Sequence, residues 1–202
     1  MSWYEIDAYG GLEKTLNDMI ASDSNFILGH CLINGLDHIG ASKSPYDVKN
    51  TNNYLEFNKL VNKVSMNLSR RELIHVKAIQ CLVKGDLLTA CEHWESILIE
   101  HPTDLMALKF IHDTYFYLGY HPQMRDSVAG VLPSWDKSLP LYSLVHGMHS
   151  FGLVQSNMFE QAKKTAMKAL EMNKNDAWAT HTICHYNEYS NQFDSGNFQD
   201  FF

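Results

Sequence analysis

The chemistry that this sequence could carry rests first on its histidines. Two pairs are spaced so that both imidazoles fall on one face of a helix: His146 with His149, and His181 with His185, which has Cys184 beside it. A four-residue spacing is the one that zinc-binding helices use, but such helices also need a third ligand and often a general base. The sequence has no HExxH motif. We therefore predict no metal site and no cofactor.

Nucleophilic chemistry also lacks a signature. The sequence contains no G-x-S-x-G elbow, no glycine-rich phosphate loop and no paired-carboxylate motif. Scattered serines, histidines and aspartates do not make a site, and function must be argued from a site. We therefore predict that the protein is not an enzyme and name no catalytic residue. A metal-dependent enzyme that uses the histidine-bearing helices remains the alternative, and a stoichiometric zinc ion in purified protein would favour it.

The elements that must position any site follow a repeating helical pattern. Three turn positions, Gly85, Gly119 and Asn157, are spaced by 34 and 38 residues. Thirty-four residues is the period of tetratricopeptide helix hairpins, and the longer interval accommodates the two-proline segment GVLPSWDKSLPLYS. The pattern predicts an all-α fold, with tetratricopeptide-type helix-hairpin repeats stacked as a short right-handed solenoid.

The predicted array covers residues 1–188. Its best repeats are residues 71–104, 105–138 and 143–176. In the first repeat, small Ala78 and Ala90 suit a close helix crossing, Trp94 fills the wedge between the helices, and Pro102 ends the second helix. Asp104 precedes the next helix as an N-cap, and Asp176 has the same place before the last one. Looser helical periodicity predicts further helices over residues 12–20, 26–39, 53–66 and 70–83.

Composition limits the classes of partner. The 202 residues are 45% hydrophobic and 19% charged, with a net charge of −7, which is typical of a globular chain. Basic residues are scattered, so we predict neither nucleic-acid nor membrane binding. No signal peptide and no apolar run of membrane-spanning length is present, and the four cysteines form no C-x-x-C motif. These features predict a cytoplasmic protein with reduced cysteines.

Specific runs carry a resemblance to a known family. The segments HPTDLMALKF, YFYLGY and QMRDSVA, together with FGLVQSNMFEQAKKTAMKALEMNKNDAWATHT, resemble the tetratricopeptide repeat protein thirty-eight family. The likeness covers roughly residues 3–184 and corresponds to the N-terminal half of the longer family members. It implies a helical-repeat protein without an established catalytic role.

The end of the chain departs from this likeness. The run HYNEYSNQFDSGNFQDFF does not continue the family pattern. A solenoid needs a polar terminal unit to cover its last apolar face, and none is evident here. We therefore expect residues 189–202 to be a divergent, mobile tail, with self-association possible through the uncapped end. A truncated or alternative product without independent activity is a further reading.

The remaining candidate is the face formed by the first helix of each hairpin, which lines the groove of such arrays. The predicted groove residues are Glu72, His75, Ile79, Met106, Lys109, Asp113, Phe116, Trp178 and His181. Aromatic side chains mixed with a few charges suit a bound peptide. An Asp at 113 would repel a peptide carboxylate, which argues against a carboxylate clamp at Lys109. The sequence thus predicts a non-catalytic interaction scaffold whose protein or peptide partner it does not identify.

Overall fold

The structure is a computed structural model that describes residues 11–39 and 52–190. Within these residues all regular elements are helical: ten α-helices and two short 3-10 helices, with no strand. The helices pack in sequential antiparallel pairs, which confirms the all-α prediction. The chain divides into two compact units, Met1–Thr114 and Tyr115–Phe202, and the boundary falls inside one helix.

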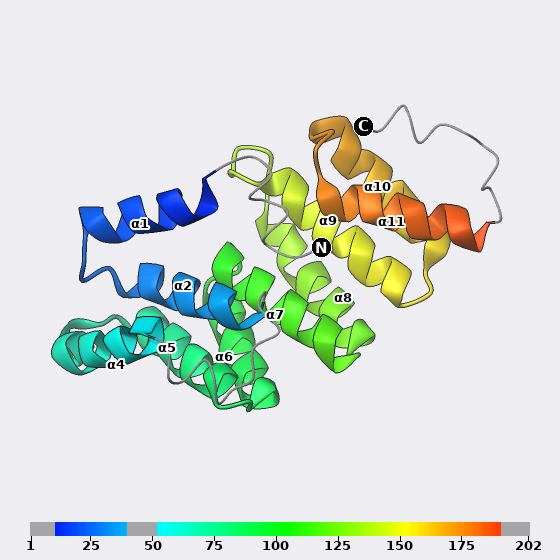
Figure 1. Cartoon of the computed structure of the whole chain (residues 1–202). Coiled ribbons are helices and arrows are strands. Elements are labelled where there is room, and N and C mark those ends of the chain that lie inside the picture. The colour runs from blue at the N-terminus through cyan, green and yellow to red at the C-terminus, as the bar shows by residue number, and fades with distance from the viewer. Residues whose placement is uncertain (1–10, 40–51, 191–202) are drawn as a thin grey trace. The chain divides into compact units, whose positions relative to one another are not determined.

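The first unit is built around the helix pair formed by α5 and α6. Its elements are α1 (Leu12–Ser22), α2 (Ile27–Ile39), α4 (Asn52–Val64), the 3-10 helix η2 (Ser65–Asn67), α5 (Arg70–Val83), α6 (Leu87–Glu100) and the start of α7 (Leu105–Leu118). Helix α2 packs against α1, α4 and α5 (Figure 1). The four helices predicted upstream of residue 84 are therefore confirmed, within two residues at their ends.

Large and small side chains interlock in this unit. Ala78 and Ala90 have no exposed surface, and Trp94 is fully buried with its ring 5.5 Å from that of Phe110. Gly35 of α2 lies so close to Phe110 that an added Cβ would be 2.3 Å from the ring. The predicted roles of the two alanines and of Trp94 are borne out: the small residues allow the helices to approach closely, and the indole fills the space beside their contact.

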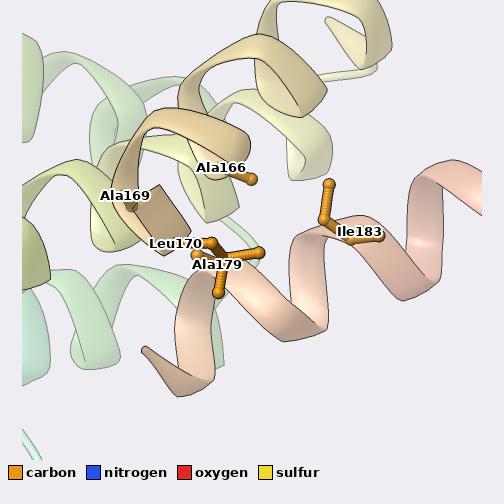
Figure 2. Close-up of a cluster of buried hydrophobic side chains, with 5 residues drawn as sticks. All are labelled: Ala166, Ala169, Leu170, Ala179 and Ile183. Atoms are coloured by element: carbon orange, nitrogen blue, oxygen red, sulfur yellow. The ribbon is translucent and has the colours of Figure 1, made fainter. Parts of the chain in front are cut away.

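The second unit contains the rest of α7 and four further α-helices. These are α8 (His121–Val131), which continues into the 3-10 helix η3 (Leu132–Ser134), then α9 (Tyr142–Gln155), α10 (Phe159–Met172) and α11 (Ala177–Tyr189). Helices α9, α10 and α11 all pack against one another, and α8 packs against α9 (Figure 1). The alanine-rich face of α10 makes this possible: Figure 2 shows Ala166, Ala169 and Leu170 meeting Ala179 and Ile183 of α11.

One turn geometry recurs after three helices, at the positions that the sequence spacing singled out. Gly85, Gly119 and Asn157 have φ angles of 82°, 72° and 60°. After each helix the residue with positive φ donates its N–H to the carbonyl three residues back, and the next residue donates to the carbonyl five back. This is the Schellman arrangement, which satisfies the orphan carbonyls at a helix end and needs a left-handed residue.

A second local geometry recurs where the next pair of helices begins. After α6, the His101 N–H donates to the carbonyl of Ile97, and the Asp104 N–H donates to the carbonyl of His101. After α10, the Asn173 and Asp176 N–H groups donate in the same way to the carbonyls of Ala169 and Asn173. The carboxylate Oδ1 of Asp104 accepts from the N–H of Ala107 at 3.0 Å, and that of Asp176 accepts from Ala179 at 3.1 Å. Both N-caps predicted from sequence are confirmed.

The extra residues of the longer interval lie between α8 and α9, in residues 132–141. Trp135 covers core there and is only 7% exposed, as a tryptophan flanked by prolines is expected to be. Leu141 has a φ of 65°, which is unusual for a leucine.

Of the predicted tail, residues 189–202, only residues 189 and 190 are among the described residues. Helix α11 continues through Tyr189, whose ring stacks on that of Phe159 with centroids 3.8 Å apart. Tyr189, the first residue of the predicted tail, therefore lies within α11. Residues 191–202 lie outside the described residues.

Candidate functional site

In the first unit, the predicted groove residues of α5 are engaged within the unit. The Glu72 carboxylate accepts from the backbone N–H of Ser69 at 2.8 Å and forms a capping box at the start of α5. His75 and Ile79 have no exposed surface. In this conformation these two side chains stabilise the unit and offer no area to a partner.

His75 belongs to a buried charge cluster around Asp104. The Asp104 Oδ2 lies 2.6 Å from Arg71 Nε and 2.9 Å from His75 Nε2. Burial acts to raise the pKa of Asp104, but the hydrogen bond and charge of His75, followed by Arg71 and the Ala107 N–H, together lower it well below its usual value. The carboxylate is therefore held ionised and paired.

The predicted groove residues of α7 in this unit are also largely paired. The Lys109 ammonium donates to Asp113 Oδ2, and the two side chains are only 13% and 8% exposed. Burial raises the pKa of Asp113, but Lys109 and His112 outweigh it and lower the pKa. Lys109 is thus neutralised by its own helix neighbour, while Met106 is half-buried.

In the second unit, predicted groove residues come together as a continuous series of ring contacts. The ring of Phe151 on α9 lies 5.4 Å from Phe116, 4.7 Å from Trp178 and 5.2 Å from His181, measured between centroids. His181 in turn contacts His185 at 4.6 Å. We call these five residues the aromatic strip. Phe116 is 37% exposed, Trp178 and His181 are half-buried, and Phe151 is the buried centre.

The two histidine pairs differ in geometry. The Nε2 atoms of His181 and His185 converge to 2.9 Å. His146, by contrast, lies against Tyr142, and its Nε2 is 3.5 Å from the Lys168 ammonium. Burial, then the charges of Lys168 and His149, lower the pKa of His146 to about 4. Among the described residues no group of three or more His, Cys, Asp or Glu side chains is placed to hold a metal ion.

Asp176 is the charged residue whose environment sequence reasoning did not anticipate. It is 2% exposed, and its Oδ2 has no hydrogen-bond partner. Burial raises its pKa to about 6, against the opposing effect of the Ala179 and Trp178 N–H groups. A Cβ added to Gly147 of α9 would be 2.3 Å from Asp176 Oδ1. The sequence does indicate this difference. Gly147 follows His75 by 72 residues, and Asp176 follows Asp104 by the same interval, so a glycine stands where the first aspartate has its histidine partner.

These features define the structural class of the protein: an all-α chain of sequential antiparallel helix pairs with an aromatic strip on its second unit. Comparison with known proteins finds no family model and no solved structure that matches the chain. None of the helices in residues 11–39 and 52–190 is long and apolar enough to cross a membrane.

Proposed function

We propose that this chain is a non-catalytic scaffold that binds a peptide or protein segment through the aromatic strip. The observation that carries the proposal is the unbroken ring contact from Phe116 through Phe151 to Trp178, His181 and His185, with both ends of the strip partly exposed. Aromatic side chains with a buried base and an accessible edge contribute most of the energy at many protein interfaces.

The proposal includes a tetratricopeptide-type architecture, in line with the family that the sequence resembles. Two local features support it: the left-handed turn that recurs at Gly85, Gly119 and Asn157, and the identical capping of α7 and α11 by aspartate. Recurrence of both geometries at matching helix ends is typical of helix-hairpin repeats. In such repeats the first helices of successive hairpins supply the binding face, and the strip lies on α7, α9 and α11.

The expected ligand is bound through apolar side chains. Lys109, the cation that a carboxylate clamp would use, is already held by Asp113. A peptide with leucine or aromatic anchors at helical spacing would instead use the apolar faces of Phe116 and Trp178.

The experiment is a selection of peptides from a displayed library on the full chain, followed by affinity measurement with variants. Phe116→Ser combined with Trp178→Ala should weaken the selected peptides by about 30-fold or more, the loss typical of a hot-spot pair. Ile99→Ser is the matched control, because Ile99 is a large apolar side chain that is 82% exposed and lies on α6, a helix of the first unit that contributes no residue to the strip.

Two outcomes would count against the proposal. Peptides that bind the double variant as tightly as the parent chain would remove the strip from consideration. A selection that yields no specific peptide would argue against a peptide-binding scaffold altogether. Circular dichroism and thermal unfolding of each variant separate loss of contact from loss of fold.

A further inference from the structure

The second unit carries a histidine pair whose ring nitrogens converge. His181 and His185 lie one turn apart on α11, and their Nε2 atoms are 2.9 Å apart. The rings meet edge to face, at an interplanar angle of 70°. Because neutral imidazole has one N–H and one lone pair, this separation means that one ring donates a proton to the lone pair of the other.

Glu188 orients His185 from the far side. Its Oε2 lies 3.2 Å from His185 Nδ1, so Nδ1–H donates to the carboxylate and Nε2 keeps the lone pair. A carboxylate on the far nitrogen is the arrangement that usually supports a metal-ligating histidine, since it fixes the tautomer and makes the ligating nitrogen more basic. The Phe151 ring, 5.2 Å from that of His181, packs against the other imidazole.

We propose that His181 and His185 chelate a divalent late transition-metal ion through their Nε2 atoms, with Cu²⁺ bound most tightly. Two nitrogens at about 2.0 Å from an ion are about 2.8 Å apart at a right angle and about 3.3 Å apart at the tetrahedral angle. The observed 2.9 Å matches the right angle, which tetragonal Cu²⁺ and Ni²⁺ prefer. Binding Cu²⁺ requires His181 to change tautomer: its Nε2 proton passes to water and its Nδ1 takes up a proton, so that the imidazole stays neutral and Nε2 gains a lone pair.

The remaining coordination positions are open to water. The side chain of His185 is 39% exposed, and Glu188 places a negative charge beside the site. Cys184 is not counted as a ligand, because among the described residues no three His, Cys, Asp or Glu side chains are placed together to hold a metal ion. A chelate with two protein ligands exchanges its ion, so we expect a reversible site rather than a structural one.

The other histidine pair of this unit supplies the matched control. His146 Nε2 has the Lys168 ammonium at 3.5 Å, and an ammonium group at that distance repels a cation. His149 is half-buried and feels the positive charge of Arg125, which contributes, after burial, to lowering its pKa. His149→Gln therefore removes an imidazole from the same unit without touching the proposed site.

The experiment is titration of the full chain with CuCl₂, followed by calorimetry and by electron paramagnetic resonance. Wild-type protein should give a site with two equivalent imidazole nitrogens in its hyperfine pattern. His181→Gln and His185→Gln should each weaken binding by at least about tenfold and lose one nitrogen from the pattern. Glu188→Gln should weaken it by a few-fold, less than the tenfold or more that is typical of outer-shell partners, because Glu188 is exposed. His149→Gln should leave affinity unchanged.

The double variant His181→Gln/His185→Gln gives the background from the other histidines. Glutamine is a good helix former, so far-ultraviolet circular dichroism should show the same helix content in every variant. Equal Cu²⁺ affinity in wild type and double variant, or a wild-type spectrum with a single nitrogen, would overturn the proposal. MgCl₂ should not compete, because a hard cation prefers oxygen ligands.

Discussion

Two aspartates, one in each unit, have the same local role as helix caps but lie in opposite electrostatic environments. Asp104 and Asp176 both cap a helix, accept from the N–H three residues on, and are almost fully buried. Asp104 is paired with Arg71 and His75, and its pKa is lowered. Asp176 has an Oδ2 without a hydrogen bond, and its pKa is raised to about 6.

The difference comes from two positions on the preceding first helix, because Arg71 of α5 corresponds to Ser143 of α9 and His75 corresponds to Gly147. Where α5 has His75, α9 has Gly147 at the 72-residue interval. The glycine lets the Asp176 carboxylate pack against the helix backbone but provides no counter-charge. The capping motif therefore determines only that the carboxylate accepts a hydrogen bond from the backbone. The residues on the neighbouring helix determine whether the charge of that carboxylate stabilises or destabilises the fold.

The largest expected effect comes from the same substitution at both aspartates. Asparagine caps a helix as well as aspartate does, so the change isolates the charge. Asp104→Asn should destabilise the first unit by about 3 kcal/mol, because it leaves His75 and Arg71 without their partner. Asp176→Asn should instead stabilise the second unit at pH 7, by up to about 3 kcal/mol, because it removes a buried charge that has no counter-charge. Denaturant unfolding measures both, and amide exchange assigns each to its unit. Equal losses would contradict the comparison.

The pH dependence should also separate the two residues. The Asp176 pKa is raised from 3.8 to about 6 in the folded chain, so its contribution to stability is full below about pH 4 and is lost as the pH rises through 6. The shift corresponds to about 3 kcal/mol. Wild type should therefore gain stability relative to Asp176→Asn as the pH is lowered from 7 to 4. Asp104 acts in the opposite sense, because its lowered pKa favours the fold at higher pH.

If the free energy of unfolding changes with pH in the same way for wild type and for Asp176→Asn between pH 4 and 7, the pKa of Asp176 is not raised. Measuring the difference between the two proteins cancels the other titrating groups, including Asp104. Unfolding monitored by circular dichroism at half-unit intervals is sufficient.

Gly147→Ala should be the next largest effect. The new Cβ would lie 2.3 Å from Asp176 Oδ1, so either the carboxylate or α9 must shift, at a cost of about 2 kcal/mol. Asp176→Ser, which keeps a capping oxygen on a shorter side chain, should recover most of the loss. Gly130→Ala is the control, because nothing lies within 4 Å of its added Cβ and alanine favours the helix. A cost in the Asp176→Ser background as large as in wild type would show that the clash is elsewhere.

The smallest effect concerns the recurring turn. Gly119 has a φ of 72° and no atom within 4 Å of an added Cβ, so Gly119→Ala should cost only the backbone strain, about 1 kcal/mol. Asn157→Gly should stabilise by a few tenths to about 1 kcal/mol for the same reason. Thermal unfolding of the two variants should shift in opposite directions. Shifts in the same direction would mean that the Asn157 side chain has a role beyond its φ angle.

Much of the fold could be predicted because its signals are local. The helices over residues 70–83 and 87–100, the left-handed turns and the aspartate caps each follow from a few neighbouring residues. The candidate site was predictable in part: periodicity placed Phe116, Trp178 and His181 on one kind of face, and the structure brings their rings together around Phe151. The same periodicity could not tell that His75 and Ile79 would be buried, because burial depends on which helix packs next to them.

The sequence by itself determined where helices begin and end, since caps, glycines and hydrophobic spacing act over four or five residues. Only the tertiary structure decided which charges are paired. Asp104 finds its partners 29 and 33 residues away, whereas Asp176 meets a glycine, and neither environment can be read from the capping motif. Both sequence and structure determine how His181 and His185 converge. Their spacing in the sequence puts them on one helix face, and contacts with Glu188 and Phe151 set the orientation of their rings.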